Sequence, residues 1–258
     1  MAARAIAKAT IAFGMVAIPV KVIGATGAAK TVRFKQLCPE CATPPKQEYR
    51  CAAHGVVERG AMLKGYEIAK GQYLQFTADE VKALNADSTK VISIAQFVPR
   101  ASIDPVWFDK PYYLSAEAGG SRAYALLAEG LRRTERVGLA QFCLRGKQYL
   151  VAVAPTTQGL AMYQLRYDYE VRAQEPEATE VLEDAEVDLA LRFIESLSAD
   201  AFDAGKYTDE VYQRQIAAIE AKAAGQPVTA PAPEVGKADI NDLMAALKAS
   251  LAASEGAA

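Results

Sequence analysis

Three cysteines and the only histidine stand in two short half-sites, and this spacing constrains the fold of its segment more than any other feature. Cys38-Pro-Glu-Cys41 is followed, after nine intervening residues, by Cys51-Ala-Ala-His54. Two half-sites of this kind can supply the four ligands of a closed tetrahedral zinc ion. Residues 36–56 are therefore predicted to fold as a zinc-ribbon-like insertion around a structural zinc ion rather than around an apolar core.

Two other interpretations of these cysteines stay open. They can be unligated thiols in a reducing compartment, or Cys38 and Cys41 can form a redox pair. The fourth cysteine, Cys143, lies in an apolar strand pattern and is expected to be a small core residue. Once zinc takes His54, the chain has no histidine for a Ser/His or Cys/His pair. It also lacks a Gly-rich phosphate loop and a G-x-S-x-G motif, so we expect a protein that is not an enzyme.

Short strand patterns separated by Gly and Pro residues predict a β-barrel or a curled sheet. Residues 9–22 alternate apolar with small or polar side chains on both sides of Gly14, which indicates two strands. The further candidate strands are Gln72–Phe76, Lys90–Phe97, Leu139–Leu144, Tyr149–Ala154 and Ala161–Tyr167.

Two helices are predicted among these strands. Thr77 and Glu80 have the spacing of a capping box that opens a short helix with Val81 and Leu84. Ser121 is expected to cap a second helix. Its expected apolar face consists of Tyr124, Leu127 and Leu131. The cations expected toward its carboxyl end are Arg132, Arg133 and Arg136.

The chain changes in character after residue 170. Residues 175–188 are acidic and lead into two helical patterns that are too few to form a bundle alone. We therefore expect them to pack on the sheet or on a second chain. The apolar positions of the two patterns are Leu189, Phe193 and Leu197, then, from a start near Thr208, Tyr212, Ile216 and Ile219.

A Pro/Ala/Gly-rich linker at 225–237 separates these helices from a short amphipathic segment at 238–258. An isolated helix of this length is marginally stable in water, so its apolar stripe favours a partner groove, although docking on its own body is the alternative. The stripe consists of Ile240, Leu243, Met244, Leu247 and Leu251.

The net charge of −2 conceals two oppositely charged parts. Residues 1–167 carry 22 Lys and Arg against 12 Asp and Glu, whereas residues 168–258 carry 7 against 19. This division indicates either a polyanion-binding body with a separate acidic part, or two solvated surfaces without a partner. The longest charge-free run near the amino terminus, Ala9–Val20, is too short to span a membrane. We therefore expect a cytoplasmic, nucleoid-associated protein with no membrane partner.

Several segments resemble the bacterial Ku family, and together they extend over about residues 6–224. The most specific is Ile103-Asp-Pro-Val-Trp-Phe-Asp-Lys-Pro-Tyr-Tyr-Leu114, and Asp242–Leu251 resembles a C-terminal motif of many members. The other matching segments are Thr10–Val22, Val32–Leu37, Lys64–Glu67, Gly71–Tyr73, Ala123–Leu127, Phe142–Gly146, Leu165–Tyr167, Ser196–Leu197, Lys206–Tyr207 and Ile219–Lys222.

The resemblance implies a mainly β fold with some α structure: a seven-stranded barrel, a DNA-encircling bridge and a C-terminal helical dimerisation arm. The implied divisions are a barrel and bridge core at 1–170, the arm at 171–224, the linker at 225–237 and a partner-recruiting helix at 238–258. It further implies a ring-shaped homodimer that binds double-stranded DNA ends without sequence preference. Such a protein recruits the multifunctional bacterial end-joining ligase in non-homologous end joining.

A ring on DNA needs Lys and Arg contacts to phosphates, which give affinity without sequence information. Seven candidates lie where the family builds part of its bridge, and a turn between two strands adds Arg145 and Lys147. The seven are Lys30, Arg33, Lys35, Lys46, Arg50, Arg59 and Lys64. Ku members differ in Cys and His content here, so the zinc prediction depends on this chain's own residues.

Two other functions are alternatives to DNA-end binding. A zinc-dependent hydrolase would need an open coordination position and a nearby general base, which a closed site with four protein ligands does not provide. A zinc-ribbon adaptor that docks on nucleic acid or RNA polymerase would show no preference for free duplex ends.

Overall fold

The computed structural model describes residues 4–27, 30–84, 89–175 and 183–228. The chain separates into two compact units. The first comprises Met1–Ala29 and Gln36–Ala173, and the second comprises Lys30–Lys35 and Gln174–Ala258. No helix in the described part of the chain is both long and apolar enough to span a membrane.

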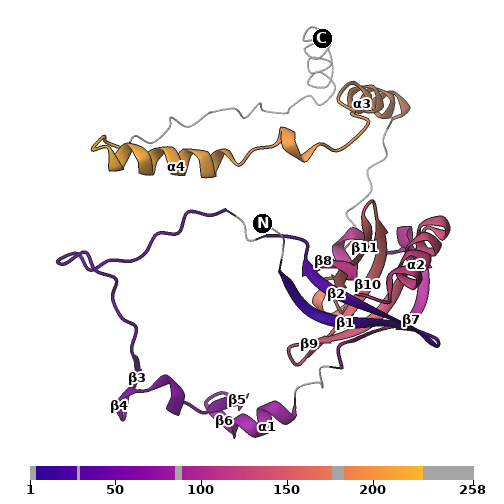
Figure 1. Cartoon of the computed structure of the whole chain (residues 1–258). Helices are drawn as coiled ribbons and strands as arrows, with labels where there is room; N and C mark the ends of the chain where they lie inside the picture. The colour runs from indigo at the N-terminus through magenta and orange to yellow at the C-terminus, as the bar shows by residue number, and fades with distance from the viewer. Residues whose placement is uncertain (1–3, 28–29, 85–88, 176–182, 229–258) are drawn as a thin grey trace. The chain divides into compact units, whose positions relative to one another are not determined.

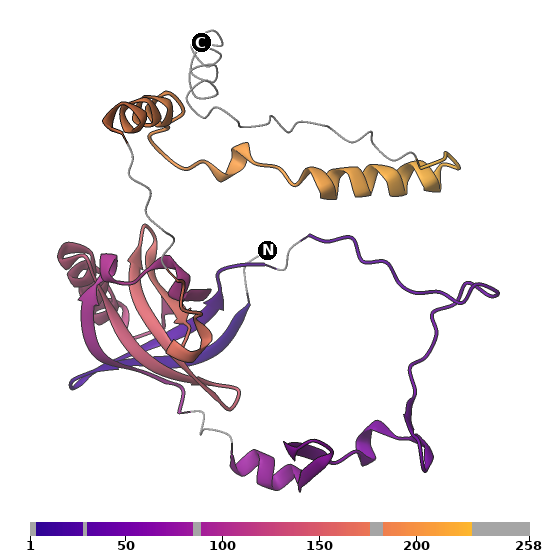
Figure 2. The same cartoon turned by 180° about the vertical axis from the view of Figure 1, so that it is seen from behind.

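Seven strands of the first unit form a closed barrel in the order β1-β2-β8-β11-β10-β9-β7 (Figures 1 and 2). All neighbours pair antiparallel except β1 and β7, which run parallel with Thr10 opposite Val91 and close the barrel. The seven-stranded barrel expected from the resemblance is confirmed. Its strands are β1 (Ala5–Phe13), β2 (Val16–Gly24), β7 (Val91–Pro99), β8 (Phe108–Ala116), β9 (Arg136–Leu144), β10 (Lys147–Thr156) and β11 (Gly159–Leu165).

Alternation of side chains along the strands produces two apolar clusters on opposite faces of the sheet. Ile18, Val20, Val151 and Val153 belong to the first cluster, which also receives side chains of the helix α2 (Ser121–Thr134). Ala152 and Ala154 point the other way and pack in the second cluster. The latter is covered by residues that include Ile103, Trp107 and Phe108. Both faces of β10 are thus buried in its middle, Val151–Ala154, which explains the apolar run there.

The Tyr124 hydroxyl fixes α2 to two strands at once. It donates to the carbonyl of Leu114 in β8 at 2.6 Å and accepts from the backbone N–H of Leu160 in β11 at 2.7 Å. Gly159, next to Leu160, has a φ of +140°, and a Cβ there would lie 2.5 Å from the Tyr124 hydroxyl oxygen. Glycine at 159 is therefore required both by the backbone conformation and by the tyrosine.

The predicted capping box is confirmed at the short helix α1 (Ala78–Ala83). The Glu80 N–H donates to Thr77 Oγ1 at 3.2 Å, and the Thr77 N–H donates to a Glu80 carboxylate oxygen at 2.7 Å. Leu84, predicted inside this helix, instead forms its C-cap and is exposed.

Two predictions about α2 were wrong at its ends, whereas its buried face of Tyr124, Leu127 and Leu131 is confirmed. The N-cap is Gly120 without a side-chain cap, and Ser121 is already helical. Glu135, with a φ of +53°, ends the helix in the left-handed conformation, so Arg136 begins β9 rather than continuing α2.

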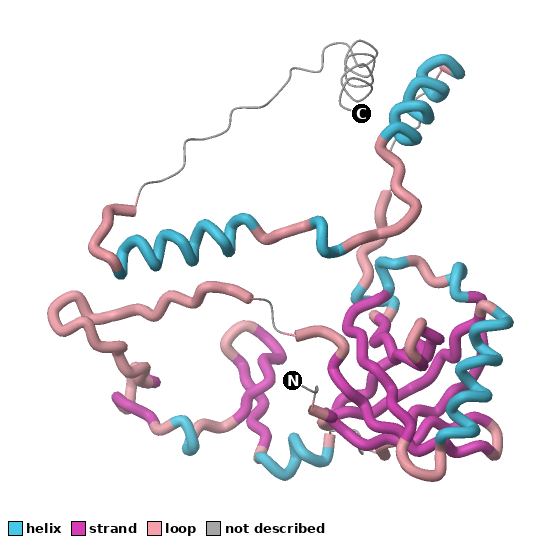
Figure 3. The backbone as a smooth tube through the Cα atoms, turned by 45° about the horizontal axis from the view of Figure 1, so that its top comes forward, coloured by secondary structure: helices cyan, strands magenta, loops and turns pink. Residues whose placement is uncertain are grey.

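The long segment between β2 and β7, residues 25–90, is called the excursion below. Its described part forms two small antiparallel hairpins (Figure 3). Of their four strands, the sequence patterns predict only Gln72–Phe76. One hairpin pairs β3 (Tyr49–Cys51) with β4 (Gly55–Val57), and the other pairs β5 (Lys64–Ala69) with β6 (Gln72–Phe76).

The second unit contains the helices α3 (Asp184–Ser196) and α4 (Glu210–Ala223), close to the predicted positions. Neither helix has a buried residue in this single chain. Exposed apolar side chains of α3 include Val187, Leu191 and Ile194, of which the latter two are 57% and 61% exposed.

Replacing Tyr124 by Phe removes the hydroxyl and leaves two backbone groups without their partner. We expect the free energy of unfolding to fall by about 1–3 kcal/mol, measured by urea denaturation followed by circular dichroism. Tyr169→Phe is the matched control, because Tyr169 is 83% exposed and its loss should change stability by less than about 0.5 kcal/mol. Equal unfolding midpoints for the two variants would contradict the role of the Tyr124 hydroxyl.

Candidate nucleic-acid interface

The excursion carries the largest group of predicted phosphate contacts. Arg50 lies in β3, Arg59 in a single 3-10 turn after β4, and Lys64 at the start of β5. Lys46 precedes the first hairpin, and all four side chains are exposed. Short hairpins therefore present these cations to solvent.

The turn between β9 and β10 presents the second group. Leu144 pairs with Lys147, so Arg145 and Gly146 form a two-residue hairpin loop. Both have positive φ, +53° and +79°, which is the conformation of the tight turns that match strand twist. Arg145 and Lys147 are both exposed; Arg145 lies in the loop between the strands, as predicted, whereas Lys147 is the first residue of β10.

The nine predicted cations are divided between the two units. Lys30, Arg33 and Lys35 belong to the second unit, and the other six belong to the first. Among the described residues, none of the nine forms an ion pair with a carboxylate. Each is therefore available to an external anion, and their contact with DNA stays a prediction.

Three exposed lysines of the same excursion were absent from the sequence-based set: Lys70, Lys82 and Lys90. Lys90 stands directly before β7, and its carbonyl accepts from the Thr10 N–H at 2.9 Å. A count of every cation between β2 and β7 would have found them, because polyanion binding depends on charge density rather than on a motif.

The two Cys/His half-sites each form a separate local turn. At the first, the Ala42 N–H donates to the Cys38 carbonyl at 2.8 Å and the Cys41 Sγ lies 2.9 Å from Thr43 Oγ1. At the second, the turn of the β3–β4 hairpin brings Cys51 Sγ within 3.5 Å of His54 Nδ1. Two ligands at ~2.3 Å and ~2.0 Å from one tetrahedral zinc ion are separated by about this distance.

Local hydrogen bonds favour the thiolate form of two of these cysteines. The side chain and then the backbone of Thr43, followed by Cys38, lower the pKa of Cys41. The backbone groups of Ala53 and His54 lower the pKa of Cys51. Thiolates are the form that binds metals.

The structure does not bring the two half-sites together. Within the described ranges, no group of three or more His, Cys, Asp or Glu side chains is close enough to hold a metal ion. Zinc binding by all four residues therefore stays a prediction, although the separation of Cys51 Sγ and His54 Nδ1 fits two ligands of one zinc ion.

The C-terminal stripe lies outside the described residues, so its partner-binding role also stays a prediction. This applies to Ile240, Leu243, Met244, Leu247 and Leu251.

Comparison with known proteins agrees with the fold. A family model described as the Ku70/Ku80 beta-barrel domain matches residues 12–189. Among relatives, the non-homologous end joining protein Ku of Paraburkholderia phymatum is 39% identical over 257 residues, which are 97% of this chain and 83% of the relative. The protein of the same name from Heliobacterium modesticaldum is 41% identical over 259 residues, covering 97% and 92% of the two chains. The family match covers more than half of the chain and takes in the barrel strands from the end of β1 to β11, and the chain therefore belongs to the Ku family.

Proposed function

We propose that this protein binds double-stranded DNA ends without sequence preference, as a ring-shaped homodimer that acts in non-homologous end joining. The observation that carries the proposal is membership of the Ku family, with relatives named for that process. The exposed cations of the excursion and of the β9–β10 turn support it, because they suit contacts to phosphates.

The proposed dimer uses the helices of the second unit. Leu191 and Ile194 of α3 and Val211 of α4 are largely exposed in the single chain. Phe202 and Tyr207, in the connection between these helices, stack on each other with ring centroids 6.1 Å apart and are also exposed. Apolar surface of this extent favours burial against a second chain. Closing a ring through such a contact would explain how DNA is held without base-specific contacts.

Free ends should matter because a closed ring can reach duplex DNA only by threading. We expect much tighter binding to a linear duplex than to a covalently closed circle of the same sequence at matched salt, measured by gel shift. Equal affinities would contradict the ring and would favour the zinc-ribbon adaptor without end preference.

The cations of the β9–β10 turn can be tested in the same assay. Replacing Arg145 and Lys147 by Gln should weaken binding for every sequence and reduce the slope of log K against log salt by about 2. Arg133→Gln is the control, because Arg133 is paired with Glu129 at 2.6 Å. If Arg133→Gln lowered the affinity as much, the effect would reflect lost net charge and not phosphate contacts of Arg145 and Lys147.

We further propose that the C-terminal stripe recruits and stimulates the bacterial multifunctional end-joining ligase. An apolar stripe behind a Pro/Ala/Gly-rich linker is typical of segments that dock as helices in a partner's groove. Deleting residues 238–258 should leave the affinity for linear DNA unchanged and abolish ligase stimulation, measured as ligated product over time. Unchanged stimulation by the shortened protein would refute this role.

Structural zinc is the proposed cofactor of the excursion. The 3.5 Å separation of Cys51 Sγ and His54 Nδ1 supports it, since two ligands of one ion can have that spacing. The first half-site would supply the remaining two thiolates after the segment between them folds over. With four protein ligands, such an ion would stabilise the fold and activate no water.

Zinc content measured by atomic emission on the purified protein tests this proposal. We expect one ion per chain, lost in Cys38→Ser and in Cys51→Ser but retained in Cys143→Ser, which lies outside both half-sites. Chelation should increase proteolysis within residues 38–54. Equal zinc content in all three variants would contradict the assigned ligands.

A further inference from the structure

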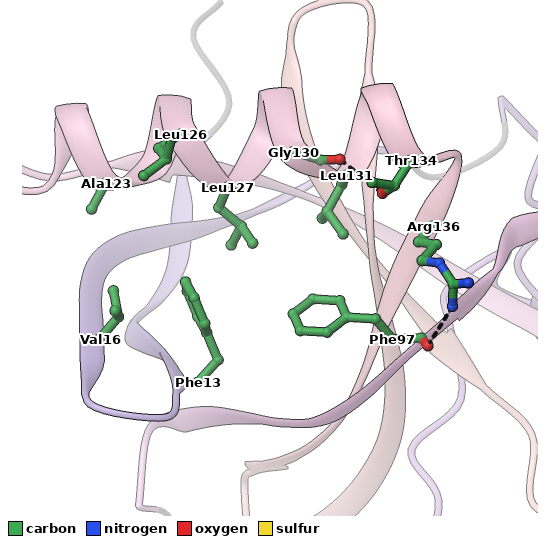
Figure 4. A pocket seen from close by; sticks show the side chains of 10 residues that line it. All are labelled: Phe13, Val16, Phe97, Ala123, Leu126, Leu127, Gly130, Leu131, Thr134 and Arg136. Atoms are coloured by element: carbon green, nitrogen blue, oxygen red, sulfur yellow. Dashed lines mark hydrogen bonds between the residues drawn. The ribbon is translucent and has the colours of Figure 1, made fainter.

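An apolar groove lies between α2 and the ends of four barrel strands, β1, β2, β7 and β9 (Figure 4). Its volume is about 420 Å³. Phe13 and Phe97 form one wall, with their rings edge to face and 6.3 Å between centroids. The helix side of the groove is formed by Ala123, Leu126, Leu127, Gly130, Leu131 and Thr134, and the first residue of β2 adds Val16.

Large apolar side chains at this groove stay in contact with water. Leu126 is 75% exposed, and Phe97 and Val16 are about two-fifths exposed. Met15, in the turn next to Val16, is fully exposed. Exposed apolar side chains gathered around a hollow are typical of surfaces that bind another apolar group.

The charge at the groove has one sign. Arg136 is the only charged residue that lines it, and its guanidinium is anchored by donation from Nη1 to the Phe97 carbonyl at 3.2 Å. Arg132 and Arg133, on the nearby end of α2, are both occupied by Glu129. Among the described residues, Arg136 forms no ion pair, so a carboxylate on the bound group would complement it.

The groove lies away from the points where the excursion joins the barrel. The excursion leaves β2 at Gly24 and returns at Val91 of β7. Val16 and Phe97, which line the groove, stand at or near the opposite ends of these two strands. At ~3.3 Å per residue, each is separated from its junction by roughly 20 Å or more. If DNA is bound through the excursion, as in the proposed function, the groove stays accessible.

We propose that this groove docks an amphipathic helical peptide of a protein partner, with aliphatic side chains between Phe13, Phe97 and Leu126 and an acidic side chain near one end of the peptide at Arg136. A helix in a groove buries residues at i, i+3, i+4 and i+7, which suits a hollow running along α2. The accessibility of the groove in the DNA-bound form rests on the proposed function, but peptide binding itself does not.

The probe is a fluorescein-labelled synthetic peptide, acetyl-Asp-Asp-Leu-Ala-Ala-Leu-Leu-Ala-Ala-Leu-Lys-Lys-amide, and binding to the full chain is followed by fluorescence anisotropy. A scrambled peptide of the same composition, with its leucines on different faces, should bind at least about tenfold more weakly, a difference of ~1.4 kcal/mol. Equal binding of the two peptides, or binding of neither, would overturn the proposal.

Two matched leucines test the location. Leu126→Glu should lower the affinity for the peptide about tenfold or more, whereas Leu84→Glu should not, although Leu84 is equally exposed at 74%. Both variants should keep the circular dichroism spectrum of the parent. Loss of binding in both, or in neither, would show that the peptide does not occupy the groove.

A double-mutant comparison tests the carboxylate contact. Replacing both aspartates of the peptide by asparagine should weaken binding to the parent protein, and Arg136→Gln should remove the difference between the two peptides. A difference that persists in Arg136→Gln would overturn the assigned pairing.

Other occupants give distinct results. If Leu126→Glu changes self-association in sedimentation but not peptide binding, the face is a contact between copies and the proposal fails. If Leu243→Asp with Leu247→Asp tightens peptide binding, the chain's own C-terminal stripe is the occupant, and a partner is excluded.

Saturating linear duplex should leave peptide affinity unchanged, and competition would place the groove in the DNA interface instead. A protein that binds the peptide but no DNA would fail only the proposed function.

Discussion

The barrel depends on a short parallel pairing between β1 and β7. Thr10, Ile11 and Ala12 lie opposite Val91, Ile92 and Ser93, and without this contact the other six strand pairs would form an open sheet. Because β7 follows the whole excursion, closure fixes both ends of that segment on one rigid body. The entropy of closing a loop rises only by about 0.6 kcal/mol for each doubling of its length. The barrel can therefore support a long, cation-bearing segment at small cost in stability, which is consistent with the proposed function.

Local patterns predicted those parts of the fold in which neighbours along the chain determine the structure. The alternation around Gly14 predicted the β1–β2 hairpin, and Gln72–Phe76 has the predicted bounds of β6. β8 was missed as a strand, since Pro111 and the charged residues Asp109 and Lys110 break its apolar pattern. The parallel closure could not be read from local sequence, because its register is set by packing between distant strands. Family resemblance supplied only the expectation of a seven-stranded barrel.

The candidate site shows the same limit. All nine predicted cations are exposed, in irregular stretches, hairpins and turns, yet nothing in residue spacing distinguishes Lys64 from the omitted Lys70 as a phosphate contact. The half-sites formed as local turns because each spans only a few residues. Their convergence on one ion depends on a longer-range fold of the excursion, in which the metal itself would contribute the free energy. Spacing could therefore suggest four candidate ligands, and their assembly around zinc stays a prediction.

The backbone conformation of the Arg145-Gly146 loop lowers the entropy that Arg145 would lose on binding an anion. A non-glycine residue with positive φ is uncommon, and here the strands on both sides of a two-residue loop keep Arg145 in that state. A backbone already confined in this way loses little freedom when the guanidinium takes a ligand. Only the side-chain torsions remain to be ordered, at about 0.5–1.5 kcal/mol for a long side chain. The hairpin tip thus acts as a preorganised charge, in contrast to a lysine on a loose loop.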